Sequence, residues 1–336
     1  MEFQILTGLE QVGLANYESL VHSCQAPLFY DPRVMLAAER TPLLPPERVF
    51  YLVAHEAGLL QAFLPCYLQS AAQIDPFGLL KRTASVDLHR AGKGLFSHIT
   101  HCYDTRLLVR EGRQDLYAPM LSHFRMLAAE VGAEYYGLVN VEDPVLRACA
   151  ERQGYRVNFM LDRYLMSLEE PKSLEGYLEG LPRDGRQELK RQLRKFQEGD
   201  ARFSIERAPL SDLEEVTRLC QETTARHGTP HYFPQRPLAE FIRQCGGLVR
   251  LFKIKRQDTL VSGFVCFEHG DTLHLWCCGV TYDQVEFSPY AISFAEAYRY
   301  ALDHGLRRIE VGRLNARIKE RLGYKPLRLY SIIGQV

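Results

Sequence analysis

Apolar residues recur along this chain with two periods, one typical of strands and one typical of helices. Two strand-like runs flank a turn in the first half of the chain, and a similar pair flanks a turn in the second half. These four runs are residues 49–55, 59–69, 248–255 and 259–268. The recurrence of paired strands at corresponding places in the two halves indicates an internal repeat.

The later part of each half matches more closely. A run with helical period ends at a glycine in both halves, Gly132 and Gly305, as expected for a left-handed helix cap. A short strand, a second helix, a Gly-Tyr-basic triplet and a last strand then follow in each half. The segments of the first half are residues 116–131, 135–139, 140–150, 154–156 and 159–168. Those of the second half are residues 289–304, 308–311, 314–322, 323–325 and 327–333.

The order strand, strand, helix, strand, helix, strand therefore occurs twice in the sequence. It predicts an α/β fold made of two tandem domains, each a mixed β-sheet with flanking helices. Charge and proline interrupt the pattern near residues 169–172, so we expect domains at 1–170 and 171–336. We expect the first domain to be structural or to assist substrate binding, and the second to carry the active site.

Composition narrows the function classes. The chain has 336 residues, 46% of them hydrophobic, with 41 basic and 41 acidic side chains, so no global field attracts DNA or an anionic membrane. The start lacks a leader pattern, and no run reaches the roughly 18 apolar residues of a membrane span. Nine cysteines without C-x-x-C pairs indicate reduced thiols and no metal site. We therefore expect a cytoplasmic protein.

With these motifs in view, the chain resembles the GNAT acyltransferase superfamily. After residue 170 it is similar to the BioF2-like branch, itself similar to the FemABX peptidyltransferases. The motifs that carry this resemblance are the basic helix 183–195, the Ser-Pro-Tyr-Ala segment 288–291, and residues 312–323. The resemblance implies tandem GNAT-type domains, with an acyl group moved from a thioester to an amine. In the Fem branch it implies an aminoacyl group moved from tRNA.

The loop that binds coenzyme A pyrophosphate in standard GNAT proteins is glycine-rich. The corresponding residues 284–289 of this chain carry Phe287 and Pro289 where glycines belong, so we expect no close approach of backbone amides to a phosphate. Residues 110–115 of the first half keep Arg110 and Gly112, which an ordinary turn also explains. We expect no permanently bound cofactor, and a thioester of coenzyme A or of a carrier protein as co-substrate.

A helix predicted at residues 183–198 carries basic side chains beside an apolar stripe of Leu189, Leu193 and Phe196. The basic residues are Arg183, Arg186, Lys190 and Arg194. They suit the phosphates of tRNA or of a phosphopantetheine arm. A solvated helix face explains the same pattern.

The strand at residues 273–279 alternates, which puts His274 and Trp276 on one face. In this fold the strand borders the cleft where donor and acceptor meet, so both side chains are candidates for substrate binding. Packing beneath a helix is the alternative. Ser288 and Arg313, within the motifs of the resemblance, are further substrate-binding candidates.

The closing helix of the second half places Asn315 and Lys319 on one side, while Leu314, Ile318 and Leu322 form an anchoring stripe. Lys319 stands four residues before a glycine, the spacing at which the Fem-like branch has an active-site lysine. A fixed ammonium there would stabilise a developing oxyanion, and Asn315 would contact substrate. A surface lysine is the alternative.

A general base is harder to choose from sequence. His227, His231, Glu268 and His274 are candidates, of which we select His231 and Glu268. The leading hypothesis is N-acyl transfer by direct attack of a small-molecule amine on the thioester. The alternatives are aminoacyl transfer from aminoacyl-tRNA and a GNAT-fold binding protein without catalysis.

Overall fold

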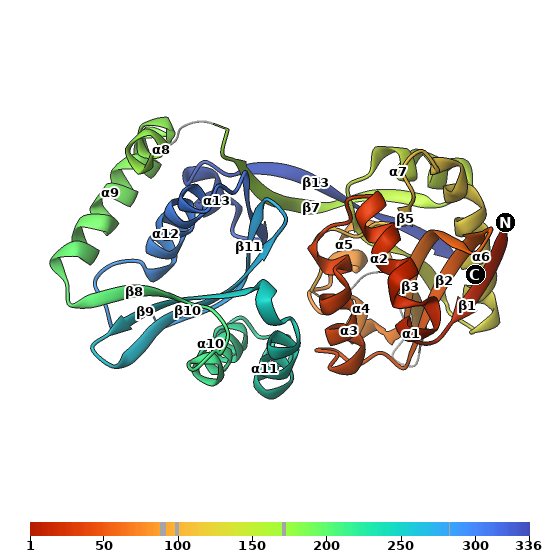
Figure 1. Ribbon diagram of the computed structural model, residues 1–336, viewed down its shortest axis with the longest axis horizontal. Helices are drawn as coiled ribbons and strands as arrows, with labels where there is room; N and C mark the ends of the chain where they lie inside the picture. The colour runs from red at the N-terminus through yellow and green to blue at the C-terminus, as the bar shows by residue number, and fades with distance from the viewer. Residues whose placement is uncertain (88–91, 98–100, 170–172, 282) are drawn as a thin grey trace. The chain divides into compact units, whose positions relative to one another are not determined.

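The computed structural model describes residues 1–87, 92–97, 101–169, 173–281 and 283–336 (Figure 1). The chain divides into two compact units, residues Met1–Leu161 with Arg328–Val336 and residues Asp162–Leu327. In the described residues, no helix has the length and apolar character needed to span a bilayer. Residues 170–172 of the expected domain break lie outside the described residues.

The first unit is a mixed sheet with the strand order β1-β2-β3-β4-β6-β13-β7, to which β7 contributes only residues up to Leu161. Its main strands are β1 (Glu2–Leu6), β2 (Arg48–Glu56), β3 (Leu59–Ser70), β4 (Lys93–Ser97), β6 (Tyr135–Val141), β7 (Arg156–Ser167) and β13 (Lys325–Gln335). The short β5 (Leu108–Val109) pairs with β3. Helices of this unit are α1 (Leu9–Val12), α2 (Leu14–Ser23), α3 (Pro32–Arg40), α4 (Ala71–Ile74), α5 (Leu79–Ala84), α6 (Tyr117–Glu130) and α7 (Pro144–Arg152).

The second unit repeats the order as β8-β9-β10-β11-β12-β7, with β7 now contributing its residues from Asp162 onward. Its own strands are β8 (Ala201–Glu206), β9 (Val249–Arg256), β10 (Thr259–His269), β11 (Thr272–Val280) and β12 (Arg308–Arg313). Its helices are α8 (Leu174–Gly180), α9 (Arg183–Glu198), α10 (Leu213–Arg226), α11 (Gln235–Gln244), α12 (Pro289–Asp303) and α13 (Ala316–Arg321). β4 and β6 run parallel in the first unit, as β11 and β12 do in the second. The predicted α/β fold with mixed β-sheet and flanking helices is confirmed, and the strands of the two units belong to one continuous sheet.

The closing strands differ from the expectation. From sequence, β7 should close the first sheet and β13 the second. Instead β13 pairs antiparallel with β6 of the first unit, and β7 pairs antiparallel with β12 of the second. Hydrophobic periodicity identifies a strand but not its partner, so the exchange left no signal in the sequence.

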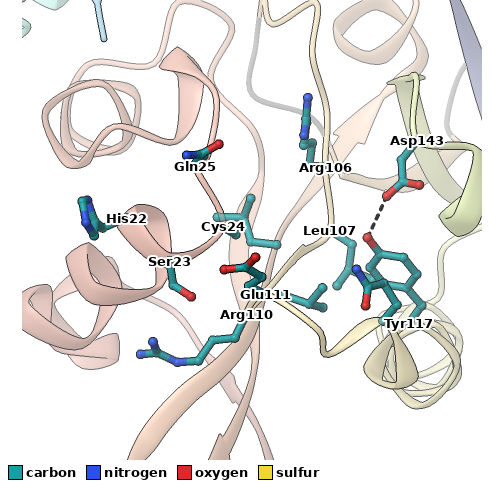
Figure 2. Close-up of a pocket in the computed structure, with 13 residues that line it drawn as sticks. His22, Ser23, Cys24, Gln25, Arg106, Leu107, Arg110, Glu111, Tyr117 and Asp143 are labelled. Carbon is teal, nitrogen blue, oxygen red and sulfur yellow. Dashed lines mark hydrogen bonds between the residues drawn. The ribbon is translucent and has the colours of Figure 1, made fainter.

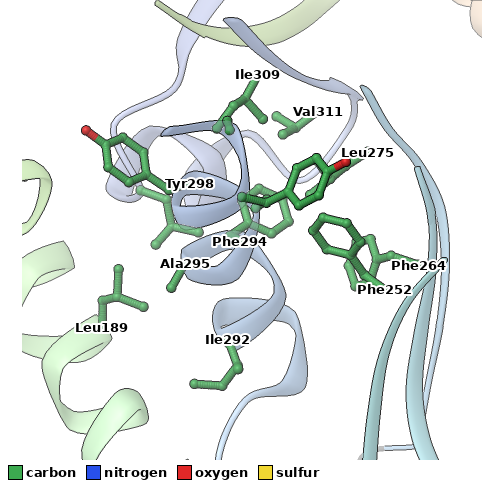
Figure 3. Packing of buried hydrophobic residues seen from close by; sticks show 14 of the residues in the cluster. Leu189, Phe252, Phe264, Leu275, Ile292, Phe294, Ala295, Tyr298, Ile309 and Val311 are labelled. Carbon is green, nitrogen blue, oxygen red and sulfur yellow. The ribbon is translucent and has the colours of Figure 1, made fainter. Parts of the chain in front are cut away.

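Large apolar side chains fill the second unit between one face of its sheet and helices α8, α9 and α12 (Figure 3). Leu189 of α9 lies in this core with Phe294 and Tyr298 of α12, as the predicted stripe requires. Helix α10 covers the other face, where Gly263 and Gly279 allow close approach because a Cβ at either position would meet α10 within 2.4 Å. Both faces of this sheet are therefore packed against helices.

Candidate active site

Lys319 is the central residue of the candidate site, and it is buried. Its side chain is only 2% exposed, although it lies on the short helix α13 after β12. The ammonium donates to the backbone oxygens of Gly312 and Arg313, with Nζ–O distances of 3.1 and 2.6 Å. The ring of Tyr164 lies 5.5 Å from Nζ. The alternative of a surface lysine is therefore wrong.

The orientation of α13 also differs from the predicted one. Leu314 and Ile318 are 53% and 46% exposed, whereas Leu322 is buried. The reason is that the helix begins only at Ala316, because Leu314 and Asn315 have left-handed φ values of 64° and 54°. The predicted stripe is thus broken, and the helix turns Lys319 inward. Asn315 is exposed at the helix start, without a capping hydrogen bond from its side chain.

Burial dominates the electrostatics of Lys319. Transfer out of water lowers the pKa of the Lys319 ammonium to about 7, although the nearby carboxylate of Glu310 acts in the opposite direction. Glu310 is itself buried, accepts a hydrogen bond from the Gly312 amide at 3.1 Å, and lies 3.8 Å from the Arg163 guanidinium. A lysine that titrates near neutral pH can serve in either protonation state.

β11 and β12 are paired over only part of their length. The pairing covers Thr272 with Arg308 through His274 with Glu310, although both strands continue beyond these residues. Beyond Glu310, the carbonyls of Gly312 and Arg313 in β12 accept hydrogen bonds from the Lys319 ammonium. The edge of β11 that faces β12 thus has no strand partner beyond His274 in the described residues. Backbone groups along such an edge are available to an extended ligand.

A β-bulge changes which residues of β11 share a face. Val265 of β10 pairs with Cys277 and Cys266 pairs with Leu275, so Trp276 is the extra residue. Cys277 consequently lies beside Cys220 of α10, with sulfurs 3.9 Å apart, whereas Cys278 packs with the α12 core. The strict alternation expected from sequence is therefore wrong after Trp276.

The two β11 candidates are enclosed differently from each other. Trp276 contacts the rings of Phe233, Phe241 and Phe267 at centroid distances of 5.4–5.5 Å, which is packing beneath α11. His274 is 8% exposed and lies beside Glu310 in the adjacent strand. His274 is therefore in register with Glu310, whose carboxylate acts on Lys319, whereas Trp276 is a packing residue.

The remaining candidates fall into two places. Arg313 donates to the hydroxyl of Tyr232 at 3.3 Å, so the loop that carries the exposed His231 reaches the end of β12. Glu268 instead pairs with Leu273 near the start of β11, roughly 13 Å along the sheet from the level of Arg313. There it accepts hydrogen bonds from Tyr300 and from Arg250, the latter at 3.1 Å.

Glu268 is held as a carboxylate in that cluster. Partial burial raises its pKa, but hydrogen bonds and charge from Tyr300 and Arg250 outweigh burial, and the net shift of the Glu268 pKa is downward. Lys319 thus donates to the Arg313 carbonyl, and the Arg313 side chain contacts Tyr232, the neighbour of His231, whereas Glu268 has other partners.

The loop before α12 is already occupied by the protein's own groups. The Ser288 amide donates to the Gln192 side chain at 2.6 Å, and the Ser288 hydroxyl caps the helix by accepting from the Ala291 amide. Phe287 packs in the core against Phe196. Ser288 is thus engaged as a helix cap, and these amides are not available to a phosphate.

The basic residues of α9 form one exposed row. Arg183, Lys190 and Arg194 are exposed, and none has a hydrogen-bond or ion-pair partner among the described residues. Arg186 is half-buried and donates to the Glu179 carbonyl at 3.1 Å. We call Arg183, Lys190 and Arg194 the α9 ridge. Free guanidinium and ammonium groups in a row suit phosphate contacts.

Sequence reasoning missed Glu310, Arg163 and Tyr164. Glu310 had a signal, since it is a lone charge between Ile309 and Val311 in an apolar strand. Arg163 and Tyr164 had none, because β7 was assigned to the other domain. In the part of the chain that the structure describes, no three His, Cys, Asp or Glu side chains are grouped as metal ligands would be.

Comparison with known proteins agrees with this architecture. Residues 183–325 match the acetyltransferase (GNAT) domain family. Over the whole chain, the fold is similar to the crystal structure of FemX, with a TM-score of 0.63, 12% identity and coverage of 98% of this chain and 97% of FemX. This chain has the tandem GNAT fold. The resemblance to tandem GNAT and Fem-like proteins expected from sequence is thus confirmed at the level of fold.

Two further structures are similar in fold to the whole chain. A tandem GNAT protein from the clavulanic acid biosynthesis pathway has a TM-score of 0.59 and 12% identity, covering 99% of this chain and 98% of that one. L-PGS from Bacillus licheniformis has a TM-score of 0.56 and 11% identity, covering 95% and 90%. Among curated proteins, none matches the sequence.

Proposed function

We propose that this protein is an N-acyltransferase that moves an acyl group from a thioester to a small-molecule amine in the second unit. The observation that carries the proposal is Lys319, a buried lysine fixed by two carbonyls at the end of β12. Burying an ammonium destabilises the folded protein by several kcal/mol. A binding protein without catalysis would have no function for such a buried ammonium.

Lys319 can stabilise the charge that develops during the reaction. An ammonium has three donors, and Gly312 and Arg313 take two, which leaves one for an acyl oxygen. When the amine attacks the acyl carbon, the carbonyl oxygen becomes an oxyanion, and a donor already in place strengthens its contact at that moment. The amine loses a proton, and we assign its acceptance to His231, whose neighbour Tyr232 contacts Arg313. Collapse of the oxyanion then breaks the carbon–sulfur bond, and the donor leaves as a thiol that carries this proton.

The thioester donor is best accommodated along β11. Its edge beyond His274 offers backbone donors and acceptors to an extended chain with amide groups, such as a phosphopantetheine arm. Coenzyme A and an acyl carrier protein both present such an arm. The amides of Ser288 and Ala291 before and at the start of α12 already donate to groups of the protein itself. We therefore expect the phosphates of the donor to contact basic side chains and not these amides. The α9 ridge supplies such side chains.

Aminoacyl transfer from aminoacyl-tRNA is a second candidate. The observation that favours it is the α9 ridge, an exposed set of cations without carboxylate partners on a protein with no net charge. Binding of tRNA that weakens steeply with salt would support this candidate over a thioester donor.

The test is acyl transfer by Lys319→Met beside a matched variant, Lys253→Met. Lys253 of β9 is also a buried lysine of the second unit, but it is paired with Glu206 of β8 and with Asp212, the residue before α10. We expect Lys319→Met to lower kcat by about 100-fold or more, as for loss of one oxyanion donor. Lys253→Met should lose activity only in proportion to its loss of folded protein. Equal kcat values for Lys319→Met and the wild type, per folded molecule, would exclude the proposal.

A further inference from the structure

The first unit contains a pocket of about 600 Å³ that the proposed chemistry does not use (Figure 2). It lies where the end of α2, the segment around β5, the start of α6 and the residue before α7 meet. Ionisable side chains dominate its walls. They include Cys24, Arg106, Arg110, Glu111, Tyr117 and Asp143.

Arg110 is a fixed cation without a carboxylate partner. Its guanidinium donates to the Leu60 carbonyl at 2.8 Å and to the Ser19 hydroxyl at 2.9 Å, and no acidic side chain lies within ion-pair distance among the described residues. Arg106 is held by Asp104 at 3.1 Å. The planar guanidinium of Arg110 keeps donors free after these two bonds. Such a preorganised fork matches a carboxylate.

The pocket also has an acidic side. Glu111 is exposed, and its carboxylate has no hydrogen-bond or ion-pair partner within the described part of the chain. Asp143 already accepts from the Tyr117 hydroxyl at 2.7 Å and from backbone amides at the start of α7. A cationic group without a carboxylate partner and an anionic group without a hydrogen-bond or ion-pair partner among the described residues therefore line one cavity. A polyphosphate would meet the charge of Glu111 unfavourably, whereas a zwitterion would satisfy both groups.

The thiol of this pocket is not activated, and the position that corresponds to Lys319 in the first unit carries no charge. Burial raises the pKa of the Cys24 thiol to about 11, although Arg106 and Arg110 oppose the shift. In the internal repeat, Ala150 occupies the place of Lys319, because each residue accepts a hydrogen bond from the tyrosine five positions later, at 3.1 and 3.0 Å. Ala150 is fully buried and bears no charge. The first unit is thus equipped to bind and not to transfer.

We infer that this pocket binds a small zwitterion of the amino-acid class, with its carboxylate on Arg110 and its ammonium beside Glu111. This inference does not depend on acyl transfer, because binding can be measured without any reaction.

The experiment is calorimetry and thermal melting of the full chain with the common L-amino acids and, for each that binds, the matching carboxamide. We expect at least one amino acid to bind and its carboxamide to bind at least about tenfold more weakly, since the charge-assisted pair is lost. Arg110→Gln should lower the affinity for this amino acid by at least about tenfold. Arg125→Gln, which removes an exposed arginine of α6 outside the pocket, should leave binding unchanged.

Because Arg110 also bonds Leu60 and Ser19, Glu111→Gln provides a second variant at an exposed position, and it should weaken binding without lowering the melting temperature. The inference is overturned if no amino acid binds at about 20 mM, a concentration that would detect even millimolar affinity. It is also overturned if Arg110→Gln and Glu111→Gln both bind like the wild type. Binding of inorganic pyrophosphate in place of amino acids would make the pocket a phosphate site and overturn it as well.

Discussion

Replacing Lys319 by methionine should change how the stability of the second unit depends on pH. An unfolded lysine titrates near pH 10.5, whereas burial lowers the pKa of Lys319 to about 7 in the folded protein. Between these values the unfolded chain binds a proton that the folded chain does not, so wild-type stability rises with pH. Each pKa unit corresponds to about 1.4 kcal/mol. Below about pH 7 both states are protonated, and the dependence disappears.

The expected effect follows from these two pKa values. From about pH 7.5 to 9.5, the free energy of unfolding of the wild type should rise by about 2.5 kcal/mol relative to Lys319→Met. The change in packing around the new methionine shifts the stability of the variant equally at every pH, so the slope isolates the titration. Trp276 is the only tryptophan and lies in the second unit, so its fluorescence in urea reports the unfolding of that unit.

Lys253→Met is the control for this measurement. Burial lowers the pKa of Lys253, but its bonds to Asp212 and Glu206 outweigh burial, and the net shift is upward. Its contribution to stability is therefore constant below pH 10.5 and is lost only as pH rises further. A stability difference between wild type and Lys319→Met that stays constant within about 0.5 kcal/mol from pH 7.5 to 9.5 would refute a lowered pKa of Lys319.

Three further predictions concern the same unit. If the ammonium form of Lys319 is the active one, kcat should fall as pH rises through about 7; a rise that Lys319→Met lacks would assign Lys319 as the base. Gly185→Ala should destabilise the protein by about 1–3 kcal/mol and lower activity, because the new Cβ would lie 2.0 Å from a backbone oxygen of α13. Gly180→Ala, with open space around its Cβ, should change neither thermal melting nor rate. The double variant Lys190→Glu and Arg194→Glu should weaken binding of the phosphate-bearing donor several-fold with an unchanged melt; unaltered affinity would remove the ridge from the site.

Helices with long amphipathic patterns could be predicted from sequence almost residue by residue. The basic helix expected at 183–198 is α9 with the same bounds, and its stripe residues Leu189 and Leu193 are buried as predicted. Sixteen residues give the pattern several turns over which to repeat, so a local irregularity cannot shift it.

Short elements at the site could not be predicted in the same way. Helix α13 has six residues, and the left-handed backbone of Leu314 delays its start, which no rule for a bulky residue anticipates. The bulge at Trp276 likewise has no characteristic side chain, yet it reverses the faces of the residues that follow. Lys319 was found by its spacing from Gly323, but its burial accompanies the late start of α13 and could be read only from the structure.

The exchange of closing strands ties the beginning of this protein to its end. Ile332 lies fully buried beside β6, and Gly137 leaves no room there for a side chain, since a Cβ would lie 2.0 Å from the Ile332 oxygen. The sheet of the first unit therefore stays incomplete on the ribosome until residues 328–336 have emerged. A nonsense codon within β13 would damage the unit whose other strands are synthesised first.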